Sequence, residues 1–327
     1  MHTGETHFVQ RTHCPACGSG KRSELYSASY TEPPLSSFLD GFYRPQGGFE
    51  IEHLRGARYR VAECQDCELV YQIEVPDDFL THKLYDEWIN PEGARRAHDE
   101  IRGVDFYHRL AREIELAVRY FGRKPAELSF FDFGMGWGEW CLMARSFGCR
   151  VAGAELSPVR IEFAQANGIR VVPWEAIPAE RFDLINTEQV FEHVDAPLET
   201  LCHIVQALAP GGLLKLSVPD AADIKRRLAR ADWTAPPGSP GDLNAVAPLE
   251  HINCFAGGSL ARMAARAGLT PVHTTSRALR QGSKLDLTLR DVIRPAYKTA
   301  LKLKHGTAYT PNYLFFRRAD EARSRPD

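Results

Sequence analysis

Short apolar runs alternate with amphipathic stretches along residues 126–327. Each apolar run holds four to six residues, a length typical of buried strands. The stretches between them repeat apolar residues with a helical period, and alternation of this kind predicts parallel strands joined by helices, an α/β fold. The predicted strands are Leu128–Phe133, Arg150–Glu155, Ile169–Val172, Asp183–Asn186, Leu213–Val218, Thr270–Thr275 and Asn312–Arg317.

Turn and capping residues mark where the predicted helices begin and end. Ser157 followed by Pro158 is typical of a helix start, because serine caps free N–H groups and proline fits the first helical position. Glycine after an amphipathic stretch is typical of a helix end. The helices predicted in this way are residues 103–122, 158–167, 197–208 and 259–267, and the basic stretch 284–304 predicts one more.

The composition of the chain changes twice and predicts three segments. Residues 1–75 are rich in turn residues and carry two cysteine pairs, with Pro33-Pro34 among the breakers. Residues 76–125 are charged and helical. We therefore predict a small cysteine-bearing segment (1–75), a helical connector or lid (76–125) and an α/β domain (126–327).

Charge and cysteine content narrow the class of protein. Lys and Arg number 40 against 42 Asp and Glu in 327 residues, so the net charge is −2, whereas nucleic-acid binders usually carry a basic surplus. No apolar run approaches the roughly 18 residues of a membrane helix. Eight cysteines are too few for a disulfide scaffold. We expect a soluble cytoplasmic protein with a small-molecule partner and neither membrane nor nucleic acid.

Two CxxC pairs in the first segment predict a zinc site. Cys14, Cys17, Cys64 and Cys67 supply four thiolates, the set that structural tetrahedral zinc requires. A redox CxxC is the rival reading, but that chemistry needs one pair. Four ordinary buried cysteines are the plainer alternative, although Gly18, Ser19 and Gly20 place the first pair in a turn.

A glycine-rich turn follows the first predicted strand. Gly134, Gly136 and Gly138 have the spacing GxGxG, and the absence of side chains lets backbone N–H groups approach a ligand. A dinucleotide fingerprint has the spacing GxGxxG, and Glu139 stands at its third glycine. The turn therefore disfavours a nicotinamide or flavin cofactor.

Glu155 ends the next predicted strand, 21 residues after Gly134. An acid at this place can accept hydrogen bonds from the two hydroxyls of a ribose. Alone, a solvated carboxylate at a strand end would be the better reading. The glycine turn at the right distance favours ribose binding.

These motifs in this order resemble the class I S-adenosylmethionine-dependent methyltransferases. The resemblance implies a Rossmann-like seven-stranded sheet with an antiparallel last strand, and S-adenosylmethionine as cofactor. It includes Pro210-Gly211-Gly212 as the turn before the fifth strand and Glu192-His193-Val194 after the fourth. The residues that it implies for cofactor binding are Asp132, Phe133, Gly134, Gly136, Gly138, Glu155, Leu156, Trp174, Glu175 and Gln189.

With the cysteine segment ahead of this core, residues 14–275 resemble the sugar C-methyltransferases of deoxysugar biosynthesis. That resemblance implies a nucleotide-linked sugar as substrate and a Glu-His pair that provides the base. The positions that match are Glu250 and His251, together with His193 after the fourth strand and Tyr85 upstream of the core. Methyl transfer at carbon or oxygen needs such a base to take a proton from the acceptor.

Alternatives remain open at several of these positions. His193 is as well explained by bracing the helix 197–208, and Tyr85 is better explained by helix packing. An RNA methyltransferase with an N-terminal zinc module is a second function, although Asn186-Thr187-Glu188-Gln189 lacks the Pro-Pro-aromatic tetrad of many nitrogen-methylating enzymes. A non-catalytic binding protein built on the cofactor fold is a third.

Overall fold

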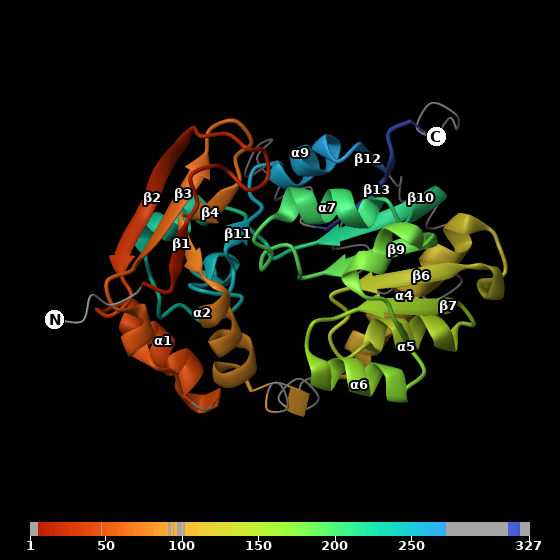
Figure 1. Ribbon diagram of the computed structural model, residues 1–327, viewed down its shortest axis with the longest axis horizontal. Helices are drawn as coiled ribbons and strands as arrows, with labels where there is room; N and C mark the ends of the chain where they lie inside the picture. Colours follow the sequence, from red (N-terminus) through yellow and green to blue (C-terminus); the bar gives the residue numbers. More distant parts are fainter. Residues whose placement is uncertain are drawn as a thin grey trace. The chain divides into compact units, whose positions relative to one another are not determined.

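The apolar runs form a seven-stranded sheet in the computed structural model, which describes residues 6–46, 48–90, 93, 95, 96, 100, 102–272 and 313–320. The predicted helix 284–304, residues 273–275 and residue 312 lie outside the described residues. In Figure 1 the strands step from β12 and β13 through β10, β9 and β6 to β7, and β8 follows at the edge. In that order their bounds are Leu269–Pro271, Tyr313–Arg318, Leu208–Ser217, Phe182–Glu188, Ser129–Phe133, Arg150–Ala154 and Arg170–Val171.

Strand directions confirm the predicted α/β fold. β13 pairs antiparallel with β10 and with β12. All other neighbouring strands pair parallel: β10 with β9, β9 with β6, β6 with β7, and β7 with β8. Phe130 and Phe131 are both fully buried although they point to opposite faces of β6. Burial of both faces is the rule for a parallel sheet that is covered by its crossover helices.

Helices connect the strands much as their caps predicted. They are α4 (Val104–Phe121), α5 (Glu139–Ser146), α6 (Pro158–Ala166), α7 (Pro197–Val205) and α9 (Ser259–Arg266). α4, α5 and α6 share one apolar cluster with the sheet, which includes Ile114, Trp140, Ala164 and Phe130. The amphipathic stripe of α4 is therefore used for packing.

The segment before the fifth strand differs from its prediction. α7 ends at Val205, and β10 begins at Leu208 and continues through Pro210-Gly211-Gly212. The register against β9 shifts between Leu208 and Leu213, and Gly211 has φ +72°. A glycine in the left-handed region accommodates such a bulge, so the turn residues interrupt the pairing without ending the strand.

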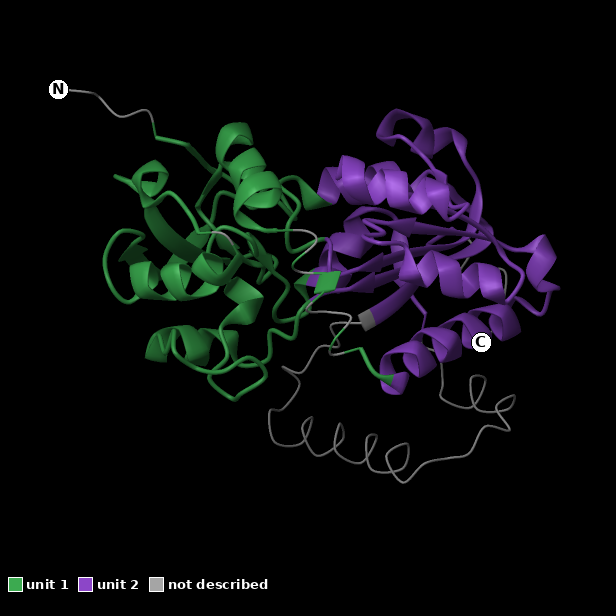
Figure 2. Ribbon diagram, turned by 90° about the horizontal axis from the view of Figure 1, so that it is seen from below, with its two compact units in different colours: residues 1–103, 191–197, 219–259 green, residues 104–190, 198–218, 260–327 purple. Residues whose placement is uncertain are grey.

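The chain divides into two compact units, coloured separately in Figure 2. Unit 1 comprises Met1–Gly103, Phe191–Pro197 and Pro219–Ser259, and unit 2 comprises Val104–Val190, Leu198–Val218 and Leu260–Asp327. Compact units and functional segments are different divisions of a chain, so the three predicted segments (1–75, 76–125 and 126–327) stay a prediction.

Unit 1 contains strands that the sequence analysis did not predict. β2 (Arg22–Ser29), β3 (Arg58–Cys64), β4 (Val70–Gln72) and β11 (Asn253–Cys254) form an antiparallel sheet. β1 (Phe8–Gln10) pairs with β5 (Glu74–Pro76). Three of these strands hold only three residues and one holds two, too few to show a period of two.

The core of unit 1 is aromatic and draws on distant parts of the chain. Tyr30, Tyr59 and Trp88 pack in one buried cluster with Trp233 and Leu243, which come from the late segment 219–259. Its helices are α1 (Leu35–Tyr43), α2 (Asp78–His82), a π-helical turn (Lys83–Trp88) and α8 (Ile224–Arg230).

Both units also contain short 3-10 turns. Those of unit 1 are Arg44–Gln46, Ile51–Leu54 and Asn244–Val246, and those of unit 2 are Pro125–Glu127 and Trp174–Ala179.

Among the described residues, every helix is too short or too polar to cross a membrane.

Candidate functional site

The glycine loop of unit 2, residues 134–138, connects β6 to α5. All three glycines have left-handed backbone angles, with φ +72° at Gly134, +55° at Gly136 and +76° at Gly138. A Cβ on Gly134 would lie 2.6 Å from Val190 Cγ2, and one on Gly138 would lie 2.5 Å from Ile169 Cδ1. Around Gly136 a Cβ would meet no described atom within 4 Å. Packing therefore requires two of the glycines, and the middle one faces open space.

Glu155 lies beside this loop, at the end of β7. Its carboxylate accepts hydrogen bonds from the Gly136 N–H at 2.9 Å, from the Leu156 N–H at 2.9 Å and from the Ser157 N–H at 3.0 Å. Its side chain is 10% exposed, so one edge of the carboxylate reaches solvent. The predicted loop and acid are thus brought together.

The donor set of this edge fits an adenosine moiety. The acid lies one hydrogen bond from the open glycine, and the neighbouring Leu156 exposes 93% of its apolar side chain. Trp174 opens a 3-10 turn after β8 and is 42% exposed, with its ring stacked 3.8 Å from the His203 ring. Glu175 follows it in the same turn. A carboxylate flanked by exposed apolar surface suits a ribose and an aromatic base.

A buried polar pair lies under the glycine loop. Asn186 Nδ2 donates to Asp132 Oδ1 at 2.7 Å, and both side chains are almost fully buried. Burial raises the pKa of Asp132 to about 7, against the hydrogen bond from Asn186 and the charge of Lys215. Asp132, one of the residues predicted to bind the cofactor, is therefore a carboxyl group whose charge changes near neutral pH.

Lys215 is a functional candidate that the sequence analysis missed. It is 2% exposed in β10 and donates to Glu113 of α4 at 2.8 Å and to Glu188 of β9 at 2.6 Å. Trp140 Nε1 also donates to Glu113. Gln189 follows Glu188 with φ +55° and donates its N–H to Ser217 O. A lysine inside an apolar strand was the only available signal, since Lys is rarely buried unless it is paired.

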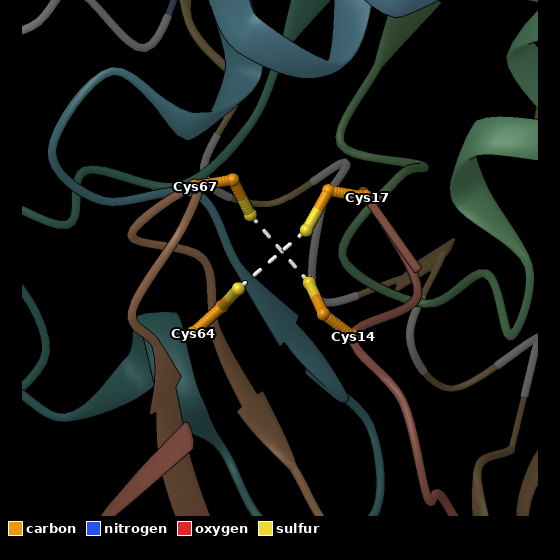
Figure 3. A group of neighbouring side chains, drawn as sticks. All are labelled: Cys14, Cys17, Cys64 and Cys67. Atoms are coloured by element: carbon orange, nitrogen blue, oxygen red, sulfur yellow. Dashed lines mark hydrogen bonds between the residues drawn. The ribbon is translucent and has the colours of Figure 1, made fainter. Parts of the chain in front are cut away.

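The four cysteines of the two CxxC pairs converge in unit 1, and Figure 3 shows their thiols pointing toward one point. The Cys14 and Cys67 sulfurs lie 3.5 Å apart, as do those of Cys17 and Cys64. Disulfide sulfurs are about 2.05 Å apart, whereas four sulfurs at 2.3 Å from one zinc ion are about 3.8 Å apart. The spacing fits a shared metal ion.

The two CxxC turns have the same backbone geometry. The Gly18 N–H donates to Cys14 O at 2.8 Å, and the Glu68 N–H donates to Cys64 O at 2.9 Å. Both residues are left-handed, with φ +74° and +62°. Each turn therefore directs its two thiols to one side, and the pairing of two such turns favours the metal over the redox reading.

The predicted catalytic residues also come together in unit 1; we call Tyr85, His193, Glu250 and His251 the histidine cluster. The rings of His193 and His251 lie 4.8 Å apart, edge to face. The Tyr85 hydroxyl, carried by the π-helical turn, lies 3.0 Å from His193 Nδ1. One π-helical turn inside an otherwise ordinary helix is frequent at functional sites.

Backbone carbonyls fix the tautomers of both histidines. His193 Nδ1 lies 3.0 Å from Glu250 O, and His251 Nδ1 is hydrogen-bonded to Asn244 O. A carbonyl oxygen only accepts, so each Nδ1 carries the proton and each Nε2 keeps its lone pair. The arrangement leaves two basic nitrogens in one cluster.

Burial keeps both imidazoles neutral. It lowers the pKa of His193 to about 3, helped by the charge that His251 would carry, and it lowers the pKa of His251 below its usual value. The hydrogen bonds to the two carbonyls act in the opposite direction. The lowered pKa keeps each imidazole in its free-base form at physiological pH, and it also makes each one a weaker base than an ordinary histidine, His193 above all.

Tyr43 is a second residue that the sequence did not single out. Its hydroxyl donates to Glu250 Oε1 at 2.7 Å, and its side chain is 1% exposed. Burial raises the pKa of Glu250, and the hydrogen bond from Tyr43 opposes this. Glu192 joins the cluster too, since its carboxylate lies within 4.8 Å of the nitrogens of both histidines. Tyr43 is far from any motif in the sequence, and no sequence signal marks it.

A model of the methyltransferase domain family matches residues 105–274, slightly more than half of the chain. Two curated relatives are ubiquinone biosynthesis O-methyltransferases. One, from Chelativorans sp. (strain BNC1), is 32% identical over 148 residues, 40% of this chain and 56% of its own. The other, from Methylobacterium sp. (strain 4-46), is 32% identical over 121 residues, 32% of this chain and 49% of its own. The chain spans about half the length of these relatives.

Solved structures of methyltransferases are similar as well. The plantazolicin methyltransferase BamL, in complex with a triazolic desmethylPZN analog and SAH, is 14% identical with a TM-score of 0.49, over 73% of this chain and 94% of its own. An S-adenosylmethionine-dependent methyltransferase from Mesorhizobium loti is 19% identical with a TM-score of 0.39, over 62% and 96%.

The family match covers β6 to β10, the glycine loop and Glu155, the elements on which the sequence resemblance was based. The relatives' names do not support the finer prediction of a sugar acceptor. The chain belongs to the methyltransferase domain family.

Proposed function

We propose that the protein methylates a carbon or oxygen atom of a small biosynthetic intermediate, with His251 as the base. The observation that carries this proposal is the histidine cluster, in which two neutral imidazoles are held with their Nε2 atoms unprotonated. When bound, S-adenosylmethionine supplies an electrophilic methyl group on a sulfonium ion. The side chains then have to orient the acceptor and remove its proton.

Cofactor binding is assigned to unit 2. Glu155 binds the ribose, the glycine loop approaches the cofactor through Gly136, and Leu156 and Trp174 flank the adenine. Asp132, Phe133, Gly134, Gly138, Glu175 and Gln189 complete the proposed set. The support is the open side of Gly136 together with a carboxylate one hydrogen bond away.

Within the cluster the residues have separate roles. His251 takes the proton from the acceptor, because its Nδ1 is bound to a carbonyl and its Nε2 remains basic. Glu250, held by Tyr43, binds hydroxyl groups of the acceptor. Tyr85 and His193 are hydrogen-bonded to each other and contact the acceptor next to the base. His193 follows Gln189 after four residues, so the chain ties it to the end of β9.

We further propose one structural zinc ion, bound by Cys14, Cys17, Cys64 and Cys67. Three of these residues are buried and one is half-buried. A closed four-thiolate site contributes to folding and leaves no open position for catalysis. The metal therefore stabilises unit 1 and takes no part in methyl transfer.

The acceptor is proposed as a sugar or a nucleotide-linked sugar, on the resemblance of residues 14–275. A hydroxyl of a ubiquinone precursor is the second candidate, because both curated relatives are named for O-methylation in that pathway. The two acceptors give different products. Methylation of the sugar, as in the C-methyltransferases, places the methyl group on carbon, whereas methylation of the ubiquinone precursor gives a methyl ether.

Product analysis and one substitution test the proposal together. The full chain is incubated with S-[methyl-¹³C]adenosylmethionine and, separately, a nucleotide-linked ketosugar and a hydroxylated ubiquinone precursor. We expect His251→Ala to lower turnover by about 10²–10⁴-fold, the usual contribution of a positioned base, with unchanged cofactor affinity. His108→Ala is the matched control, because His108 is an exposed histidine of α4 in unit 2 and lies outside the cluster.

Three outcomes would contradict parts of the proposal. Near-normal turnover in His251→Ala would remove the base role and leave His193 as the remaining candidate. Turnover that requires added Mg²⁺ or Mn²⁺ would assign Glu192, His193 and His251 to a cation. Methylation of RNA, with neither small acceptor used, would replace the small-molecule assignment.

A further inference from the structure

Arg11 is a buried cation that lies outside every motif in the sequence. Its side chain is 9% exposed, and burial lowers the pKa of its guanidinium to about 10, which leaves it charged at neutral pH. A buried arginine is costly unless its donors are satisfied. The groups that accept hydrogen bonds from the Arg11 guanidinium therefore indicate the role of this side chain.

The guanidinium binds the two segments that carry the histidines. Nη1 donates to Ile252 O at 3.2 Å and to Asn253 Oδ1 at 3.0 Å, and Nη2 donates to Asp195 O at 2.9 Å. Asp195 is two residues from His193, and Ile252 is one residue from His251. One side chain thus joins both segments.

Asn253 completes the connection from the other side. It is fully buried, and its Nδ2 donates to Phe191 O at 3.0 Å and to Val194 O at 2.6 Å. Its own N–H donates to Glu192 O at 3.0 Å. Three carbonyls that bracket His193 therefore accept from one residue of the His251 segment.

Arg11 is itself fixed in place. Its N–H donates to Ile73 O at 2.8 Å, and its carbonyl accepts from Arg22 Nη1. Cys14 follows three residues later, so the strand-like segment that begins one CxxC turn also delivers this guanidinium.

We propose that Arg11 and Asn253 are positioning residues that hold the segments of His193 and His251 in one fixed arrangement. The proposal rests on the proposed function, in which these histidines act on the acceptor. Neither residue touches an imidazole. They act through the backbone, and a rigid backbone around a base keeps its geometry and its burial.

The ionisation of the two histidines reports this role directly. The groups that face the rings are each other, the Tyr85 hydroxyl, the Glu192 carboxylate and the carbonyls of Glu250 and Asn244, with the charge of Asp242 farther away. Because burial is the first cause of both lowered pKa values, loosening the segments admits water and raises these values toward the ordinary one.

The experiment is a histidine titration by NMR of the full chain labelled with ¹³C-histidine, with signals assigned through His193→Gln and His251→Gln. Arg11→Lys keeps the charge and cannot reach three acceptors in a fork. We expect the pKa of His251 in Arg11→Lys to rise by on the order of one unit, a part of the range that burial produces. The acid limb of turnover should move upward by the same amount.

Arg318→Lys is the matched control. Like Arg11, Arg318 has three acceptors, which are here the backbone carbonyls of Val205, Gln206 and Leu208 in unit 2. It should leave both histidine titrations unchanged. If Arg11→Lys does not fold, Arg11→Gln removes the buried charge and keeps one donor.

A folded Arg11 variant in which both histidines titrate as in the unmodified chain would overturn the positioning role. So would an equal shift in Arg318→Lys, which would mark a general loss of stability. Failure of the proposed function is distinguishable, because normal turnover in His251→Ala removes the base role without changing the titration result.

Discussion

The two units build their sites in different ways. In unit 2 the cofactor elements come from adjacent secondary structure, the loop 134–138 between β6 and α5 and Glu155 at the end of β7. In unit 1 the histidine cluster is assembled from four stretches, with Tyr43, Tyr85 and His193 each from a different one and Glu250-His251 from the last. A site of local origin leaves a motif in the sequence, and an assembled one does not.

The chemistry differs in the same direction. The edge of unit 2 that we propose for the cofactor consists mainly of backbone N–H groups and one carboxylate. The cluster of unit 1 contains three titratable side chains, those of His193, Glu250 and His251, whose pKa values are displaced by burial. Displaced titratable groups are concentrated where protons move. Under the proposed function, unit 2 binds the cofactor and the cluster of unit 1 takes up the proton.

Removal of one zinc-binding thiolate should have the largest effect, because it should destabilise unit 1 and leave unit 2 folded. Cys64→Ser should cost on the order of 10 kcal/mol of zinc-dependent folding free energy, because a structural zinc site is also a folding site. We expect unit 1 to unfold while unit 2 keeps its sheet and binds S-adenosylmethionine. Elemental analysis should find one zinc per unmodified chain and none in the variant.

Cys202→Ser is the control, since Cys202 is exposed and belongs to unit 2. Unfolding of both units together in Cys64→Ser would contradict separate stabilities, and metal-free protein with a folded unit 1 would contradict the zinc site.

The glycine loop gives the next largest effect. In Gly134→Ala the new Cβ would clash with Val190 Cγ2 at 2.6 Å, at φ +72°. Overpacking and left-handed strain should together cost about 2–5 kcal/mol of folding free energy, measured by urea unfolding. Gly136→Ala has only the backbone strain, about 1–2 kcal/mol, and its Cβ lies on the open side.

The pair of variants separates packing from binding. Gly136→Ala should weaken S-adenosylmethionine binding more than its small effect on folding explains, because its methyl group enters the space reserved for the cofactor. Equal losses of stability in the two variants, with unchanged affinity for Gly136→Ala, would place the cofactor elsewhere.

The sequence predicted the seven strands of unit 2 because they are apolar runs bounded by turn signals, such as Gly134 after β6 and Gly168 before β8. It predicted the thiol cluster because spacing in CxxC is itself geometric. It missed β2, β3 and β4, whose burial does not alternate with a clear period of two, and it missed the core role of Trp233 and Leu243 within a stretch rich in Pro and Gly. Long-range hydrogen bonds such as Tyr43 to Glu250, 207 residues apart, carry no sequence signal.

Some site residues were reached only through the resemblance. Nothing in the local pattern distinguishes His193 and His251 from other histidines, and only the fold reveals that their rings meet. Lys215 shows the reverse case, since its place in an apolar strand is visible in the sequence but its two glutamate partners are not.

Glu155 tests the binding unit through its carboxylate. Glu155→Gln keeps the shape of the side chain and removes the charge, so a ribose loses an acceptor of charge-assisted hydrogen bonds. We expect the binding free energy of S-adenosylmethionine to weaken by about 1–3 kcal/mol, roughly 5- to 150-fold in affinity, as measured by isothermal calorimetry. Glu180→Gln is the control, because Glu180 forms an exposed ion pair with Arg170 in the same unit. This variant should bind S-adenosylmethionine normally.

The smallest expected effect concerns unit 1, where the neutral state of His193 should make stability depend on pH. Burial lowers its pKa to about 3 in the folded chain, while the unfolded chain keeps the ordinary value near 6.5. As pH falls below about 6.5, the unfolded chain takes up a proton that the folded chain does not, so stability is lost from there down to about pH 3. The loss between pH 7 and pH 5.5 amounts to about 1 kcal/mol for one such group.

In His193→Gln this part of the loss should be absent, whatever the variant costs at pH 7. The measurement is the free energy of unfolding in urea at pH 7 and at pH 5.5, for the unmodified chain and the variant. The difference between the two chains isolates His193 from Asp132, whose pKa is raised to about 7 by burial and whose contribution has the opposite sign. An identical pH dependence in both chains would mean that His193 is as solvated as an ordinary histidine, and the contrast between a binding unit and a unit of buried titratable groups would then rest on His251 and Glu250 alone.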